Sequence, residues 1–151
     1  MAYRFRLESV LNYRRNLEEL AQQQLGREQL ALDGHLRQLA EFEAEFARLV
    51  EELEGRKQKP VPAPLYMLYR QAIDRKEADI ARQHRVIEAQ KKKVEQARTL
   101  LMERVKARKV MEKARERDQE KHLQNELRKE QNASDEQMVL RFGRHGQRLP
   151  R

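Results

Sequence analysis

The sequence predicts an all-α fold in which two long helices form an antiparallel coiled-coil hairpin. Three observations support this prediction. Apolar residues recur every seven positions over most of the chain, three prolines fall within five residues near its middle, and only five glycines and four prolines occur among 151 residues. A sheet-rich fold would need more turns than these residues supply. With 38% charged side chains and a mean hydropathy of −1.04, the chain also has too few apolar residues for a compact globular core.

The first helix is expected at residues 7–53, where the repeat has five anchors spaced seven apart. They are Leu25, Leu32, Leu39, Phe46 and Leu53. A sustained heptad gives a narrow apolar seam and a left-handed supercoil with a partner helix. Further upstream, Val10, Leu17 and Leu20 are displaced from the repeat by about one residue. Gly26 lies near that displacement, which indicates a local unwinding there.

A turn is expected at residues 54–64, because Pro60, Pro62 and Pro64 follow Gly55. A proline inside a helix costs about 3 kcal/mol, whereas Pro64 suits the first turn of a new helix. The second helix is therefore predicted at residues 65–141, with a flexible tail at 142–151 and one coiled-coil domain over 1–151. Its heptad anchors are Tyr66, Ile73, Ile80, Ile87, Val94 and Leu101.

The two repeats fit one antiparallel register, in which the numbers of facing residues add up to 119. Leu39 then faces Ile80, and the centre of the register falls inside the proline turn. The intermediate layers are less apolar, and polar groups in a seam fix its register. They are predicted to pair Leu49 with Arg70, Phe42 with Glu77, His35 with His84, and Glu28 with Lys91. The alternative is a long helix that dimerises with another chain, but the proline cluster argues against it.

The same register ends the first helix opposite Glu112, so residues 113–141 should overhang as an unpaired helix. This segment contains Leu123 and Leu127, and later Met138, Val139 and Leu140. An isolated helix with few apolar residues gains little stability by itself, and it suits docking along a groove or inside a ring.

Catalytic, metal and cofactor sites are not expected. The absence of cysteine excludes disulfides, thiolate nucleophiles and Cys-ligated zinc, and no nucleotide-binding, metalloprotease or EF-hand pattern occurs. Opposed His35 and His84 could bind a metal or respond to pH, but without a carboxylate nearby we expect a plain polar layer. No run of 18 apolar residues is present, so a spanning segment is not expected and the default location is the cytoplasm.

The net charge of +8 is concentrated in the second half, where residues 82–129 hold 16 basic and 8 acidic side chains. Its densest part is the basic stretch Arg104, Lys106, Arg108, Lys109, Lys113, Arg115 and Arg117. Such a stretch fits nucleic acid, an acidic membrane surface, an acidic protein groove or simply a solvated face. The 5% of aromatic residues disfavours specific nucleic-acid binding, and the missing broad apolar face disfavours direct membrane insertion.

The N-terminal residues form a motif that resembles the opening of the FliJ family of the flagellar type III export apparatus. The motif reads Phe5-x-Leu7-x-x-Val10-Leu11-x-x-Arg14-x-x-x-Glu18. Chain length, hairpin layout and central turn also resemble that family. Two further segments match it moderately, at residues 80–85 and at the acidic ending with Glu126, Glu130, Asp135 and Glu136.

The resemblance implies a non-enzymatic stalk protein without cofactors. Such a protein binds and stimulates the export ATPase hexamer together with its regulator, links it to the export gate membrane protein, and escorts export chaperones. It would lie in the cytoplasm, peripherally at the cytoplasmic face of the inner membrane. The stalk protein of a virulence type III secretion system, and a nucleic-acid-binding or structural coiled coil, are the alternatives. The opening motif favours the flagellar branch.

Two sets of contact residues follow from this resemblance and from the overhang. The expected ATPase contacts are Phe5, Leu7, Leu11, Arg14, Arg115, Arg117, Leu123 and Leu127. The expected export-gate contacts are Tyr69, Ile73, Ile80 and His84. Glu77 stands in the second set where the family leads us to expect an apolar residue.

Overall fold

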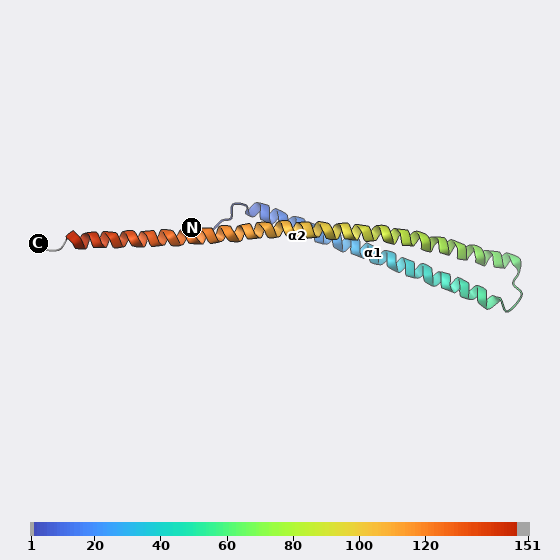
Figure 1. Ribbon diagram of the computed structural model, residues 1–151. Helices are drawn as coiled ribbons and strands as arrows, with labels where there is room; N and C mark the ends of the chain where they lie inside the picture. The colour runs from blue at the N-terminus through green and yellow to red at the C-terminus, as the bar shows by residue number, and fades with distance from the viewer. Residues whose placement is uncertain (1, 148–151) are drawn as a thin grey trace. The chain divides into compact units, whose positions relative to one another are not determined.

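The computed structural model describes residues 2–147, and over this range it is all-helical. Helix α1 spans Glu8–Arg56 and helix α2 spans Ala63–Gln147, joined by residues 57–62 (Figure 1). No strand occurs within residues 2–147. The predicted fold class of two long packed helices is confirmed. Residues 142–147 of the predicted tail belong to α2, and residues 148–151 lie outside the described range.

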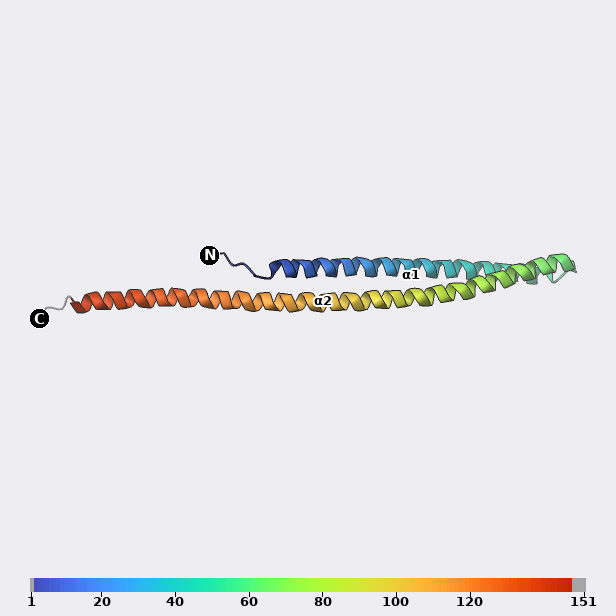
Figure 2. The ribbon, with the colours of Figure 1, turned by 90° about the horizontal axis from the view of Figure 1, so that it is seen from above.

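The chain divides into two compact units, and both helices contribute to each. The turn unit comprises residues 17–104, and the terminal unit comprises the described residues of 1–16 and 105–151. In the turn unit, the two helical segments run in opposite directions and are connected by the green turn seen in Figures 1 and 2. The prediction of a single coiled-coil domain over 1–151 stays a prediction.

Local sequence explains where the helices begin and end. Glu8 lies in the first turn of α1 and Arg56 in its last turn, where each charge interacts favourably with the helix dipole. After the prolines of the turn, α2 begins at Ala63, and the Tyr66 amide donates to the Pro62 carbonyl oxygen at 3.0 Å. Pro64 therefore lies in the first helical turn, where its missing N–H costs nothing.

The seam of the turn unit follows the predicted heptads. Leu53, Ile73, Ile87 and Val94 are buried, together with the small side chains of Ala21 and Ala97. Other anchors are half-buried: Leu25, Leu32, Leu39, Phe46, Ile80 and Leu101. Tyr66 is the exception, because its side chain is exposed beside the turn. The predicted anchor at Tyr66 is therefore wrong.

Two buried glutamines fix how the helices pair. Gln83 Nε2 donates to the His35 carbonyl oxygen at 2.8 Å, and Gln90 Nε2 donates to the Glu28 carbonyl oxygen at 2.9 Å. Each carbonyl oxygen has two lone pairs, so it can accept this bond beside its intrahelical one. The residue numbers of both pairs add up to 118, one less than predicted for these layers.

The predicted intermediate layers are therefore wrong on the α2 side by one residue. Lys76, Gln83 and Gln90 occupy the seam, whereas Glu77, His84 and Lys91 are exposed. The reason is the antiparallel direction: a three-residue step along α1 faces a four-residue step along α2, so the sum alternates between 119 and 118. Arg70 is likewise exposed, and the half-buried residue of its layer is Tyr69. An opposed His35–His84 pair does not exist.

The predicted irregularity in the first helix is also wrong. Val10 and Leu20 are exposed, whereas Leu11 and Ala21 are buried. Leu11 stands two heptads before Leu25, so the repeat continues along α1 without a shift. Helix α1 is continuous through Gly26. Of the apolar side chains that suggested a displacement, Val10 and Leu20 lie on the outer surface of α1, and Leu17 is half-buried.

The narrow seam leads to a stability prediction. Replacing Ile87, which is buried, by Asp removes apolar burial and places a carboxylate among apolar atoms, so we expect a loss of about 3 kcal/mol or more. Val86→Asp provides the matched control, because its side chain is 41% exposed and the expected change is within about 0.5 kcal/mol. Thermal and urea unfolding followed by circular dichroism measures both. Equal losses in the two variants would contradict the seam assignment.

Candidate functional site

The terminal unit begins with an arm, residues 2–7, that lies against α2 before α1 starts. Phe5, Leu11 and Met111 form a small apolar core, with Tyr3 and Ala114 packed against it. The Tyr3 hydroxyl donates to Asp118 Oδ2 at 2.8 Å, and the Tyr3 ring centre lies 5.3 Å from that of His122. Contacts with the N-terminal residues thus reach His122.

The prediction that α2 is unpaired from residue 113 onwards is therefore wrong. Helix α1 itself reaches past Glu112, because Arg15 pairs with Glu112 and Glu8 with Arg115. The arm continues from there, and Tyr3 contacts Asp118 and His122. The unpaired part of α2 starts at residue 123.

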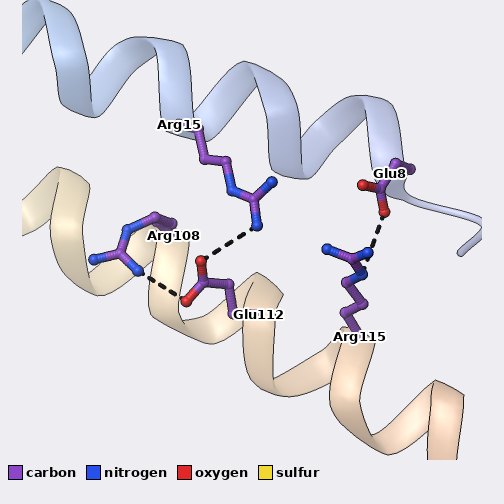
Figure 3. A network of polar contacts seen from close by, with 5 residues as sticks. All are labelled: Glu8, Arg15, Arg108, Glu112 and Arg115. Atoms are coloured by element: carbon purple, nitrogen blue, oxygen red, sulfur yellow. Dashed lines mark hydrogen bonds and ion pairs between the residues drawn. The ribbon is translucent and has the colours of Figure 1, made fainter.

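Charged side chains tie the start of α1 to α2 (Figure 3). Glu112 pairs with Arg15 at 3.5 Å and with Arg108 at 2.8 Å, and the Arg115 Nε atom lies 3.6 Å from a Glu8 carboxylate oxygen. Arg14 donates to the Ala107 carbonyl oxygen at 2.8 Å. Exposed ion pairs contribute little individually, so the network positions the helix start more than it stabilises the fold.

The structure divides the expected ATPase contacts into two groups. Phe5 and Leu11 are buried in the small core, and Arg14 and Arg115 are engaged between the helices. The second group is exposed: Leu7, Arg117, Leu123 and Leu127. Only this second group offers side chains to a partner while the hairpin stays closed.

The expected export-gate contacts do not form one surface. Ile73 is buried and Ile80 half-buried in the seam. The Tyr69 hydroxyl donates to Glu52 at 3.4 Å, and the Arg56 guanidinium lies 5.4 Å from the Tyr69 ring centre. His84 alone lies on the outer face of α2, beside a hollow lined also by Arg85, Ala89 and Lys92.

The terminal unit presents a group of exposed apolar side chains on the free segment, which we define as residues 123–143 of α2. Every side chain in it is exposed except that of Glu126. Six large apolar side chains here are 55–73% exposed: Leu123, Leu127, Met138, Val139, Leu140 and Phe142. Figure 2 shows α2 continuing past the start of α1 as a single helix. The first five of these side chains were singled out from the sequence, and Phe142 was not.

Two side chains at helix contacts have raised pKa values. Burial, followed by the hydrogen bond to Asp118, raises the pKa of Tyr3 to about 12. The hydrogen bond to Glu45 is the main cause that raises the pKa of Lys76. Both shifts favour the protonated form, which donates the hydrogen bond to the facing carboxylate. Over residues 2–147 there is no group of three or more His, Asp and Glu side chains placed to hold a metal ion.

A separate search of the described helices found none long and apolar enough to cross a membrane.

The paired seam, the N-terminal arm and the free segment define the class of protein: an antiparallel coiled-coil hairpin with one helix extending beyond the other. The family model described as Flagellar FliJ protein matches residues 3–147, and the chain belongs to this family. Membership in this family supports a stalk protein of type III protein export. The resemblance noted in the sequence is thereby confirmed.

A solved structure shares the fold. It is described as a putative YscO homolog, CT670, from Chlamydia trachomatis, and it is 19% identical with a TM-score of 0.74. The alignment covers 98% of this chain and 100% of that chain. A search of curated protein sequences gave no significant match.

The Tyr3 contact leads to a pH prediction. The pKa of Tyr3 is raised from 10.0 to about 12, so its contribution to stability is complete below about pH 10 and is lost as the pH rises towards 12. Tyr3→Phe should therefore melt at a lower temperature than the wild type near pH 8. This difference should shrink or reverse at alkaline pH.

Melting curves from pH 7 to pH 11.5 test this expectation. Tyr13→Phe is the matched control because Tyr13 is exposed, and it should melt like the wild type near pH 8. A Tyr3→Phe difference that stays constant over the whole range would show that the hydroxyl contact with Asp118 does not contribute.

Proposed function

We propose that this protein is the stalk-like component of a flagellar export apparatus that binds the export ATPase hexamer and stimulates ATP hydrolysis. The observation that carries the proposal is the free segment, with six exposed apolar side chains on a helix that has no α1 residues beside it. An isolated helix of this kind is marginal in water, and a partner groove or ring would stabilise it.

The closed terminal unit supports this proposal. Phe5, Leu11 and Met111 fasten the N-terminal residues to α2, so the free segment begins at a defined point after His122. A helix held firmly at one end loses less freedom on docking than a fully mobile peptide, which favours binding. The segment also carries charges of both signs, including Arg128, Lys129 and Arg141. These suit the polar rim of an interface.

Further roles are proposed by family resemblance. They are contact with the regulator of the ATPase, a link to the export gate membrane protein and escort of export chaperones, all in support of motility. They place the protein in the cytoplasm and peripherally at the inner membrane. Of the expected gate residues, His84 is the one available on an outer face. The gate proposal therefore rests on the surface around His84 rather than on Ile73 and Ile80.

A stalk role in a virulence type III secretion system is the second candidate. The fold shared with the YscO homolog favours it. Restoration of swimming in a flagellar deletion strain would support the flagellar role, and restoration of secretion in a virulence deletion strain would support the second. The alternative of a nucleic-acid-binding coiled coil rests on the basic stretch. A salt-dependent titration of the protein with DNA tests it.

The free segment yields the main functional prediction. A chain truncated after His122 keeps the arm contacts, so it should melt within a few degrees of the full chain. It should no longer stimulate the export ATPase. In the full-length protein, Leu123→Ser with Leu127→Ser should reduce the stimulation at least about tenfold, as two exposed anchors of about 1 kcal/mol each are removed.

Leu20→Ser with Leu30→Ser is the control pair, since these leucines are 60% and 71% exposed on α1. It should stimulate ATP hydrolysis as well as the wild type. A steady-state ATPase assay with the purified enzyme measures all four proteins. Full stimulation by the truncated chain would show that the free segment is not the effector.

A further inference from the structure

The hairpin tip, which we define as residues 55–70, combines positive charge with exposed apolar side chains. It contains Arg56, Lys57, Lys59 and Arg70 but no acidic residue. Arg56 lies over the Tyr69 ring and Arg70 pairs with Asp74 at 3.6 Å. Among residues 2–147 the ammonium groups of Lys57 and Lys59 have no hydrogen-bond or ion-pair partner, and both residues are exposed.

The backbone adds to this positive field. Helix α2 begins inside the tip at Ala63, and its first turn contains no acidic residue. The partial positive charge of a helix N-terminus is therefore left without a neutralising side chain. A hollow beside it is lined by Arg56, Lys59 and Pro62, with Leu65 on its α2 side. An anionic group near this hollow would face cations and the helix end together.

Apolar side chains project from the same place. Tyr66, Met67 and Leu68 are 44%, 60% and 63% exposed, although they are consecutive in the first two turns of α2. Three consecutive helical residues point in different directions, so they do not form a stripe for one partner helix. An aromatic and two aliphatic side chains next to lysines are typical of protein surfaces that lie in a lipid headgroup region.

We propose that the hairpin tip binds an anionic lipid surface. Lys57 and Lys59 contact lipid phosphates, while Met67 and Leu68 enter the headgroup region beside them. The contact is superficial and reversible, and no helix crosses the bilayer. The inference does not depend on the ATPase role of the free segment.

The basic stretch is the obvious competitor for anionic vesicles, because Lys106, Lys109, Lys113 and Arg117 are all exposed there. It differs from the tip in its apolar content. Val110 is exposed within it, at 63%, but its four neighbours on either side include only Ala107, Met111 and Ala114 as apolar residues, and Met111 is buried. If anionic vesicles bound through the basic stretch, Val110 would stay in water. Binding through the hairpin tip instead brings Leu68 into the lipid headgroup region.

A fluorescence experiment distinguishes these two surfaces. The chain has no cysteine, so Leu68→Cys and Val110→Cys each accept one environment-sensitive nitrobenzoxadiazole label. The two positions are equally exposed, at 63%. With vesicles of phosphatidylglycerol and phosphatidylcholine, the label at position 68 should shift to the blue and brighten, and the label at 110 should change little. Vesicles of phosphatidylcholine alone should have no effect on either.

Co-sedimentation with the same vesicles tests the lysines. Lys57→Gln with Lys59→Gln should weaken binding about 30-fold, because each lysine near an anionic surface contributes roughly a factor of five. The control, Lys92→Gln with Lys93→Gln, makes the same change in net charge at exposed positions of α2 and should leave binding within about twofold. Met67→Ser with Leu68→Ser should weaken binding while the melting temperature is retained.

Three results would overturn the inference. The first is that the full-length protein stays in the supernatant with phosphatidylglycerol vesicles at low salt. The others are equal responses of the labels at 68 and 110, and equal weakening by the two lysine pairs, because both would indicate attraction by overall charge. Binding of the tip to an acidic protein without binding to vesicles would assign the surface to a protein partner instead.

Discussion

The structure depends on one narrow apolar seam between two antiparallel helices. Along the paired stretch, about one side chain in three or four is buried or half-buried in the seam, and most of the remaining surface is exposed. The seam is a single layer of side chains. A polar residue buried in it therefore needs a hydrogen-bond partner on the facing helix. Gln83 and Gln90 find one in the backbone carbonyl oxygens of α1. These bonds are possible in one register, which makes the two glutamines register markers as well as satisfied buried groups.

The seam also determines where functional surfaces can lie. In two paired helices most side chains face water, so we expect partners to be recognised by exposed faces and ends. In the terminal unit, the arm closes the pairing at His122 and leaves the free segment unpaired. In the turn unit, the proline-rich turn exposes both charge and apolar side chains at the tip. The two ends differ in chemistry, since the free segment carries charges of both signs whereas the tip is uniformly basic.

The motif that connects this chain with the FliJ family is largely a packing motif. Phe5 and Leu11 are buried against Met111, and Arg14 binds the Ala107 carbonyl oxygen. These residues close the hairpin and hold the start of α1 in place. They do not themselves describe a partner, because their side chains are already used within the chain. Within the motif, Leu7 and Val10 are the apolar residues left accessible.

The sequence by itself determined the fold class, the turn and most anchors of the seam, because a heptad repeat broken by three prolines permits little else. Ile73, Ile87 and Val94 are where the repeat predicts them. Tertiary structure decided which neighbours complete the seam, since a three-residue step on one helix faces a four-residue step on the other when the helices run in opposite directions. That geometry places Gln83 inside and His84 outside. It also decided where pairing stops: Glu8 of α1 pairs with Arg115, and the non-helical residues before it bring Tyr3 to His122, which the heptad repeat does not encode.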